Sequence, residues 1–296
     1  MTRASGIQRL TRAALAALAL LAVLVFAGCG EDEAQEAAGG GAETVTEAAE
    51  EAAPQDVGLM KSGTLTVGMN LQFEPQMYLK DGQPAGYDVD LLNKIAPAMQ
   101  AKLDIQNLDF NGLIPGLQSK KFDMVSVGLS NTPERAKAVD FTRAYVPYVQ
   151  VLAVGKADAG ASDPAAFNKS GMTITALQGS TGEQLAKKLF PEAEVKGLPD
   201  QNAAFLEVAT GRANGIVVED YLLAQFQKTN PDKLEKAAFP EPLDVQYGSY
   251  AVQKGNKALV TFLDAWLCKA QLDGTLEETY KKNFGVEEFP EMPSCP

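Results

Sequence analysis

The chain has 296 residues and carries 26 Lys and Arg against 38 Asp and Glu, which gives a formal net charge of −12. It has no histidine and only three cysteines, which excludes a His- or Cys-rich metal site and a Ser-His or Cys-His nucleophile pair. A purely carboxylate metal site stays formally possible, but we expect no metal and no cofactor. The acidic balance argues against nucleic acid as a partner, and the length suffices for two modest domains.

Residues 1–28 have the features of a lipoprotein export signal. Three arginines precede an apolar run of 16 residues at 13–28, which is short for a membrane span and typical of a signal sequence. The run ends in Phe26-Ala27-Gly28-Cys29, which is similar to a lipobox, so we expect a lipid anchor at Cys29. The alternatives are an uncleaved anchor helix and a plain signal peptide with an incidental cysteine.

Residues 29–60 are rich in alanine and acidic residues, and residues 30–58 contain no aromatic residue. A segment of this composition cannot bury enough apolar surface to order itself, although it is compatible with transient helix. We therefore predict a disordered tether between the lipid and the folded part of the chain.

The folded part starts near Lys61 and opens with strand signals. Residues 65–69 form a β-prone apolar run, and residues 103–108 predict a second strand. Between these strands, Asp81-Gly82 predicts a hairpin turn. A helix then begins at Asp88, its expected N-cap, and its apolar stripe consists of Leu91, Leu92, Ile95 and Met99.

The stretch 122–143 joins a strand to a helix start. An apolar run ends at Gly128, a polar turn follows, and Thr132 is the expected N-cap of a helix that begins with Pro133. Such a junction leaves backbone N–H groups that attract anions. Arg135, in the first turn, adds a planar fork of donors suited to a carboxylate. The alternative is a surface arginine on a solvated helix.

The middle of the chain repeats this arrangement before the chain returns to the first block. A strand predicted at 172–177 is followed by Gln178-Gly179-Ser180-Thr181, which places hydroxyl residues at another helix start. The other expected elements are strands at 149–154 and 244–252, a strand that ends at Glu219, and helices at 203–211, 259–271 and 276–284.

Strand–helix alternation in two blocks with two crossing strands predicts an α/β fold of two lobes, with a ligand cleft between them. The first and last blocks form lobe 1, which comprises residues 61–149 plus 246–296. Residues 150–245 form lobe 2. Both ends of the folded part then belong to lobe 1, as expected where the second lobe is an insertion.

Several motifs follow the order typical of one family. They are Gly86-Tyr87-Asp88-Val89-Asp90, Asp109–Leu117, Gly128–Arg135 and Gly211–Tyr221. Together they closely resemble the signatures of bacterial extracellular solute-binding proteins for polar amino acids, the receptors of ABC importers. The resemblance runs from about Leu65 to Gly285. It implies the two-lobed periplasmic-binding-protein fold, with two strands that cross between the lobes.

The resemblance also implies a set of ligand contacts. Arg135 would grip the ligand α-carboxylate, and an acid at the end of a lobe 2 strand would hold the ammonium. Glu219 aligns with that acid and Asp220 is its neighbour, so both remain candidates. The other expected contacts are Ser130 and the Gly128 backbone beside the arginine, Ser180 and Thr181 from lobe 2, Phe73 and Phe110 as aromatic walls, and Asn70 for specificity.

The chain departs from the family pattern at positions that bear on specificity. Glu74 and Gln76 stand where the family often has proline and phenylalanine, and Asn214 replaces a customary Asp. Specificity therefore depends on how Asn70, Gln72, Gln76 and Phe110 are placed. The resemblance does not name the ligand.

The implied function is capture of a small zwitterion, a polar amino acid, by hinge closure and its delivery to ABC permease subunits. We expect an exported monomer that is not an enzyme. It would be lipid-anchored to the outer face of the cell membrane, or periplasmic if the envelope has an outer membrane. Two alternatives remain: an enzyme similar to cyclohexadienyl dehydratase, with Glu219 or Asp220 as general acid, and a binding-only sensor module.

Cys268 and Cys295 are the cysteines left once Cys29 is lipidated. In an exported protein two thiols tend to pair, so we predict a disulfide that holds the proline-rich tail on the last helices. Two free thiols are the alternative, because spacing alone cannot bring their Cα atoms within bonding range.

Overall fold

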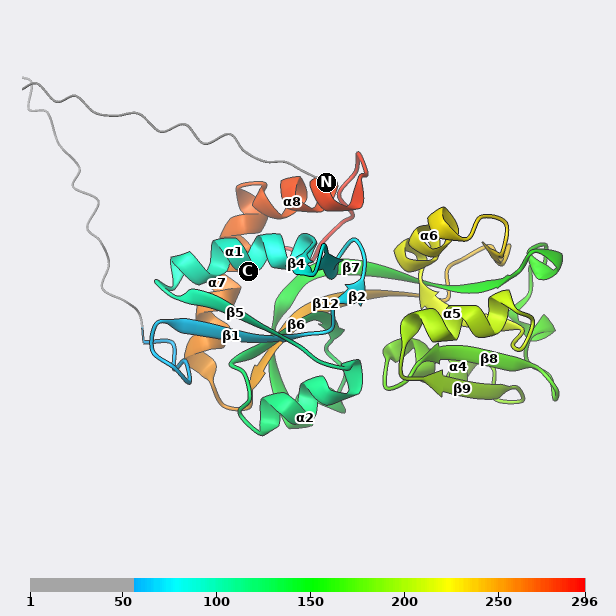
Figure 1. Ribbon diagram of the computed structural model, residues 1–296, viewed down its shortest axis with the longest axis horizontal. Helices are drawn as coiled ribbons and strands as arrows, with labels where there is room; N and C mark the ends of the chain where they lie inside the picture. The colour runs from blue at the N-terminus through cyan, green and yellow to red at the C-terminus, as the bar shows by residue number, and fades with distance from the viewer. Residues whose placement is uncertain (1–55, 296) are drawn as a thin grey trace, which may run out of the picture. The chain divides into compact units, whose positions relative to one another are not determined.

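The computed structural model describes residues 56–295 (Figure 1). The predictions for the export signal, the lipidation site Cys29 and the tether up to residue 55 lie outside the described residues. Within the described range, no helix combines the length and the apolar character that crossing a bilayer requires.

One mixed sheet organises the described residues. Its path of hydrogen-bonded neighbours is β5-β1-β6-β12-β7-β10-β8-β9, and β11 pairs with β7 at the side. In that order the strands are Lys102–Asn107, Thr64–Met69, Met124–Ser130, Asp244–Gln253, Val139–Gly155, Gly215–Glu219, Thr173–Leu177 and Glu194–Leu198, and β11 is Leu234–Lys236. A small antiparallel sheet consists of β2 (Gln72–Phe73), β3 (Met77–Lys80) and β4 (Gln83–Ala85), with the predicted turn at Asp81-Gly82.

The two strands β7 and β12 cross between two groups of strands, as predicted. They run antiparallel to each other, from the pair Gln150–Asp244 to the pair Val139–Gln253. At one end β12 pairs with β6, and at the other end β7 pairs with β10. Figure 1 shows both strands passing from the group with β1, β5 and β6 to the group with β8 and β9. The two-lobed α/β fold is thereby confirmed.

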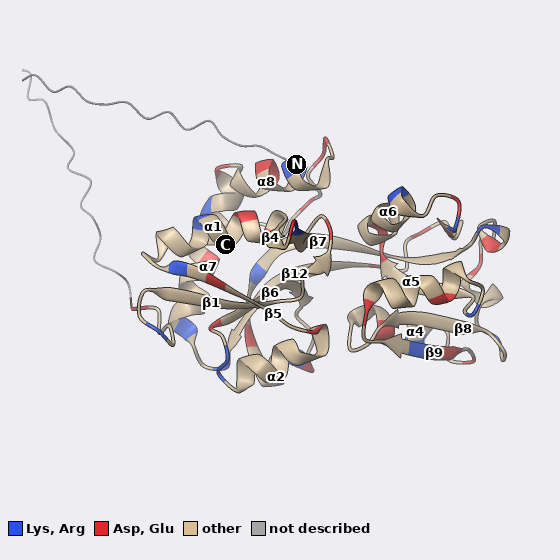
Figure 2. Ribbon diagram, in the orientation of Figure 1, with Lys and Arg blue, Asp and Glu red and all other residues tan. Residues whose placement is uncertain are grey.

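Helices cover both strand groups. In the first group they are α1 (Tyr87–Ala98), α2 (Leu113–Gln118), α3 (Arg135–Ala138), α7 (Lys257–Leu272) and α8 (Thr275–Phe284); in the second they are α4 (Thr181–Leu189), α5 (Gln201–Ala209) and α6 (Asp220–Thr229). Short 3-10 turns occur at Phe110–Gly112, Lys156–Asp158 and Pro164–Ala166. Lys and Arg are scattered among Asp and Glu on the helices and loops (Figure 2).

The central strands β1 and β6 are buried at nearly every position, as expected for strands that have helices on both faces of the sheet. Leu65, Val67 and Met69 on β1 are fully buried, and so are Met124 and Val125 on β6. Burying each such side chain contributes roughly 1.5–3 kcal/mol. This rigid support holds the carboxyl ends of β1 and β6, where the chain turns toward the candidate site.

The prediction that Asp88 caps the first helix is wrong. Gly86 occupies the N-cap position, and no side chain in the described part of the chain caps this helix end. Asp88 is instead fully buried and accepts hydrogen bonds from Ser126 Oγ (2.6 Å), Tyr145 Oη (2.5 Å) and Gln76 Nε2 (3.0 Å). Burial raises the pKa of Asp88 to about 6 in spite of these donors. The carboxyl group is thus part of a buried polar network.

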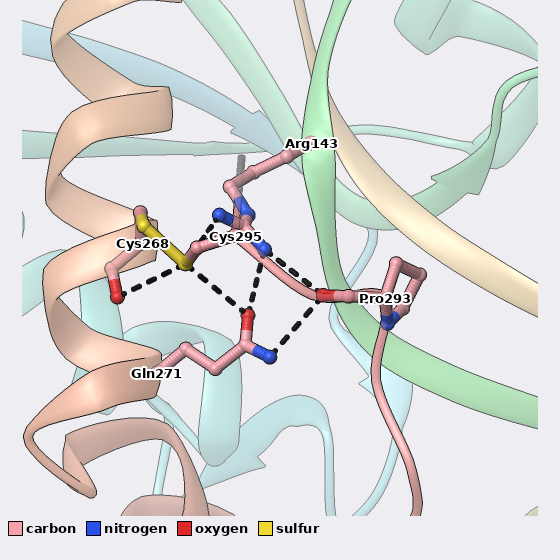
Figure 3. The surroundings of a disulfide bond; sticks show 5 residues. All are labelled: Arg143, Cys268, Gln271, Pro293 and Cys295. Atoms are coloured by element: carbon pink, nitrogen blue, oxygen red, sulfur yellow. Dashed lines mark hydrogen bonds between the residues drawn. A yellow bond between two sulfur atoms is a disulfide. The ribbon is translucent and has the colours of Figure 1, made fainter.

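The C-terminal tail is joined to α7 by a disulfide between Cys268 and Cys295, whose Cα atoms lie 5.6 Å apart. Figure 3 shows Arg143, from β7, reaching into the same region. Its Nη2 donates to Gln271 Oε1 (2.7 Å) and to the carbonyl oxygen of Pro293 (3.0 Å). The tail is therefore held both covalently and through an arginine of a crossing strand.

Candidate functional site

A cavity of about 40 Å³ lies where the two strand groups meet. The first group and the crossing strand line it with Phe73, Phe110, residues 127–130, Arg135 and Tyr148; the second lines it with Leu177, residues 180–182, Gln201, Val217, Glu219, Tyr221 and Leu222. The carboxyl ends of β6, β8 and β10 all reach this cavity. In open α/β sheets such ends are the usual place for ligands.

Arg135 is a buried cation that faces this cavity. Its side chain donates from Nη1 to the carbonyl oxygen of Ser130 (3.2 Å) and from Nη2 to that of Gly179 (3.1 Å). Its Cζ lies 5.9 Å from the centre of the Phe110 ring. Among the described residues no carboxylate lies within ion-pair distance of it. Burial lowers the pKa of Arg135 to about 10, so the side chain still carries its charge at neutral pH.

The local helix start holds Arg135 in place. Its helix α3 is a single turn, and the Thr132 hydroxyl accepts a hydrogen bond from the Arg135 backbone N–H (3.3 Å). The prediction that Thr132 is the N-cap is wrong, because the helix begins two residues later than Pro133 and Glu134 occupies the N-cap position. The alternative of a solvated surface arginine is wrong, since Arg135 is only 8% exposed.

Gly128 lines the cavity, but its backbone N–H is already used. That N–H donates to the Tyr145 hydroxyl (3.0 Å), so the expectation that it serves a bound anion does not fit this geometry. The residue has φ of +58°, and a Cβ there would lie 1.4 Å from the Tyr148 hydroxyl oxygen. Glycine is required here both for the backbone conformation and for the close approach of Tyr148.

Hydroxyl groups from both strand groups meet at one amide. Ser130 Oγ donates to Gln246 Oε1 (3.0 Å), and Thr181 Oγ1 donates to the same oxygen (2.7 Å). Ser180 is the N-cap of α4, as its position suggested, and accepts from the Glu183 backbone N–H (3.1 Å). The first N–H groups of α4 have no partner within the helix, so this end favours an anion.

Glu219 is the acid that lines the cavity. It ends β10, and its Oε1 accepts from Gln150 Nε2 (2.8 Å). Burial raises the pKa of Glu219 above its ordinary value, and the nearby Asp220 adds to this effect. The other amide atom of Gln150, Oε1, is buried without a hydrogen-bond partner in the described part of the chain. Asp220 is exposed and does not line the cavity.

The two predicted aromatic walls come together. The Phe73 and Phe110 rings pack edge to face, with centroids 6.4 Å apart, and both line the cavity. Asn70 does not reach the cavity. It is buried beside it, where Nδ2 donates to the carbonyl oxygen of Leu108 (2.6 Å) and Oδ1 accepts from Gln72 Nε2 (2.5 Å). Asn70 thus positions the loop rather than lining the site.

Sequence reasoning missed several lining or bridging residues: Tyr148, Gln150, Gln201, Tyr221 and Gln246. Gln76, which the sequence did single out, accepts from Tyr221 Oη (2.9 Å) and Tyr148 Oη (3.1 Å). Gln72 Oε1 accepts from the Gln201 backbone N–H (2.9 Å). Both glutamines therefore connect the first strand group to helices of the second.

The described residues offer no cluster of three or more His, Cys, Asp or Glu side chains that could hold a metal ion. The site instead presents one cation and one anion, hydroxyl donors and aromatic walls. A group with both a carboxylate and an ammonium is the chemical complement of this arrangement.

Comparison with known proteins points to one family. The profile of the bacterial extracellular solute-binding proteins, family 3, matches residues 65–286. The arginine-binding extracellular protein ArtP of Bacillus subtilis is 29% identical over 225 residues, which cover 75% of this chain and 87% of ArtP. ABC transporter arginine-binding protein 1 of Escherichia coli is 32% identical over 196 residues, 65% of this chain and 79% of that protein.

Solved structures give the same picture. The ancestral amino acid-binding protein AncCDT-1, described as a precursor of cyclohexadienyl dehydratase, superposes with a TM-score of 0.69 at 32% sequence identity. The superposition covers 76% of this chain and 97% of the ancestral protein. The shared part therefore includes nearly the whole of that protein.

Proposed function

The chain belongs to the bacterial extracellular solute-binding proteins of family 3, and on that premise we propose that it captures an amino acid for an ABC importer. The ligand binds as a zwitterion in the cavity between the two lobes. The loaded protein then docks on the permease subunits of the importer. The relatives named above are binding proteins, which supports a role without catalysis.

The observation that carries this proposal is that Arg135 and Glu219 line one cavity and that neither forms an ion pair within residues 56–295. A buried charge without a partner is costly, and an α-carboxylate and an α-ammonium would supply both partners at once. Each charged hydrogen bond contributes about 1.5–3 kcal/mol net. Several of them, with apolar contact to Phe73 and Phe110, suffice for micromolar affinity, which corresponds to about 8 kcal/mol.

Hinge closure follows from the division of these groups between lobes. We assign residues 61–149 and 246–296 to lobe 1 and residues 150–245 to lobe 2, with the hinge on β7 and β12. Arg135, Ser130, Phe73 and Phe110 then belong to lobe 1, while Ser180, Thr181 and Glu219 belong to lobe 2. A ligand that bridges both sets favours the closed state, because only that state makes all the contacts.

We further propose export and lipid attachment at Cys29, with the acidic segment as a tether and the protein as a monomer. The motif Phe26-Ala27-Gly28-Cys29 supports this, as does the extracellular character of the family. Mass spectrometry of the protein from a membrane fraction tests it. A mature N-terminus at Cys29 that carries a diacylglycerol group is expected, and an unmodified Cys29 would contradict the anchor.

The binding function is tested with the mature chain, unfolded and refolded to remove any ligand carried through purification. A thermal-shift screen covers the twenty amino acids, ornithine, cystine and opines, and calorimetry follows for each ligand that raises the melting temperature. We expect at least one amino acid to bind saturably, and melting temperatures that stay unchanged for all of them would contradict the proposal.

A second candidate is an enzyme similar to cyclohexadienyl dehydratase. It is favoured by the superposition on the precursor of such an enzyme and by the raised pKa of Glu219, which suits a general acid. Incubation of the protein with prephenate and with the amino acids that bind separates the two candidates. Recovery of every compound unchanged supports a binding protein, whereas loss of water from the cyclohexadienyl acid would establish the enzyme.

A further inference from the structure

We propose that the ligand is a neutral amino acid with a carboxamide side chain, and that the Gln201 side chain recognises this carboxamide. This inference rests on the proposed amino-acid binding and deepens it. Two of the relatives described above are named as arginine-binding proteins. The charges and hydrogen-bonding groups of this cavity must therefore explain why a carboxamide amino acid would bind here in preference to arginine.

The charges of the cavity argue for a ligand side chain without charge. Arg135 and Glu219 are the charged residues among its lining, and the α-carboxylate and α-ammonium would match both of them. A guanidinium or ammonium on the ligand side chain would then be buried with no carboxylate left to pair with it. A carboxylate side chain would likewise have no cation, and burying an unpaired charge is strongly unfavourable.

Other acidic residues near the cavity are not available to pair with a positive charge on the ligand side chain. Asp88 receives three hydrogen bonds, one of them from Gln76, and does not line the cavity. Glu183 accepts from the Gly179 backbone N–H (2.7 Å) and pairs with Lys187 (2.7 Å). Asp220 is exposed outside the cavity. The environment of a ligand side chain is therefore electrically neutral in the described part of the chain.

Gln201 supplies the polar group that a neutral side chain would need. It is 4% exposed and lines the cavity, and its Nε2 is buried without a hydrogen-bond partner among the residues that the structure describes. Its backbone is fixed at the start of α5, where Asp200 is the N-cap and the Gln201 N–H donates to Gln72 Oε1 (2.9 Å). A buried unpaired donor destabilises a protein unless a ligand or water satisfies it.

A carboxamide is the best match for this amide. An amide group has both a donor and an acceptor, so two carboxamides can pair reciprocally, and a hydroxyl or an alkyl group offers less. Leu177, Val217 and Leu222 also line the cavity, so apolar contact is available to the methylene groups of such a side chain.

The first test compares ligands on the wild-type mature protein by calorimetry. Glutamine and asparagine are measured against arginine, lysine, glutamate, serine, threonine and alanine. We expect one of the two carboxamides to bind at least ~10-fold more tightly than any other ligand of this set. Tighter binding of a charged, hydroxyl or alkyl amino acid overturns the inference but leaves the proposed function in place, whereas no binding at all overturns both.

The second test changes the recognising side chain. Gln201→Leu should weaken binding of the preferred carboxamide by ~10-fold to 100-fold and change alanine binding by less than ~3-fold. Gln201→Glu should shift preference toward lysine and arginine, because it adds an acid to the cavity. Gln184→Leu, at an exposed position on α4, is the matched control. Unchanged carboxamide affinity in both Gln201 variants would overturn the assignment of Gln201.

Discussion

Arg135 donates a hydrogen bond from Nη2 to the backbone carbonyl oxygen of Gly179, 3.1 Å away and 44 positions later in the chain. Gly179 stands in the turn between β8 and α4, whereas Arg135 follows β6. The cation that faces the candidate ligand site is thus also a contact between the two strand groups. The Arg135 side chain would therefore take part both in binding the ligand carboxylate and in the contact that forms when the lobes close.

Arg135→Ala should weaken binding of the amino acid found in the screen by ~100-fold or more. The change removes charge-assisted hydrogen bonds to the carboxylate, worth about 1.5–3 kcal/mol each. The melting temperature without ligand should change little, because the lost hydrogen bonds are offset by no longer burying an unpaired cation. Calorimetry and thermal denaturation measure both effects. Arg212→Ala is the control, since Arg212 is exposed and pairs with Glu207 at the surface (2.8 Å).

Glu219→Gln should weaken binding by ~10-fold to 100-fold because the ligand ammonium loses its anion. Asp220→Asn, the neighbouring change outside the cavity, should alter affinity by less than ~3-fold. A larger loss of affinity in Asp220→Asn than in Glu219→Gln would mean that Asp220, and not Glu219, holds the ammonium.

Wild-type affinity should also fall as the pH drops through the raised pKa of Glu219, since the protonated acid no longer attracts the ammonium. Dissociation constants measured at several pH values check this.

Local sequence signals predicted the parts of the site that depend on local structure. The Ser180 cap of α4 and the hairpin at Asp81-Gly82 each involve residues a few positions apart. Their geometry follows from turn and cap chemistry, which neighbouring residues determine. The two crossing strands were also predictable, because their β-prone runs stand between blocks of alternating strands and helices.

The sequence did not predict the network beneath the site, because its partners are far apart in the chain. Asp88 looked like a helix cap, yet its donors Ser126 and Tyr145 come from positions 38 and 57 residues later. The contact of Tyr221 with Gln76 spans 145 residues. A local pattern cannot tell whether an acid at a helix start will face solvent or another layer of the fold, so tertiary packing decided these roles.

Asp88 should make the free energy of unfolding depend on pH. Burial raises its pKa to about 6, above the ordinary value of 3.8, so the folded state binds its proton more tightly than the unfolded state. The stabilisation of the fold that comes from this tighter proton binding is fully present below the pKa of Asp88 in the unfolded chain. It is lost as the pH rises through about 6, the pKa of Asp88 in the folded protein. The free energy of unfolding of wild type should therefore fall relative to that of Asp88→Asn as the pH rises across this range. Urea denaturation of both proteins at several pH values measures this.

Asp140 provides an internal contrast for that measurement. Burial alone would raise the pKa of Asp140, but its hydrogen bonds and ion pairs with Lys254 and Lys257 have the larger effect and lower the pKa to about 2. The ionised Asp140 therefore stabilises the fold above its ordinary pKa, and this stabilisation is lost as the pH falls toward 2. Asp140→Asn should thus lower the free energy of unfolding at neutral pH but not near pH 2. A pH profile of Asp88→Asn that runs parallel to that of wild type would contradict the role of Asp88.

Loss of the Cys268–Cys295 disulfide should lower the free energy of unfolding by about 2–4 kcal/mol and leave ligand affinity within ~2-fold. The bond closes a segment with a sequence separation of 27 and holds the tail on α7, and neither cysteine lines the candidate site. The paired variant Cys268→Ser with Cys295→Ser, compared with wild type by urea denaturation and calorimetry, measures both effects. A non-reduced digest should contain the peptide that joins the two cysteines, whereas two thiols open to alkylation in the native protein would rule the bond out.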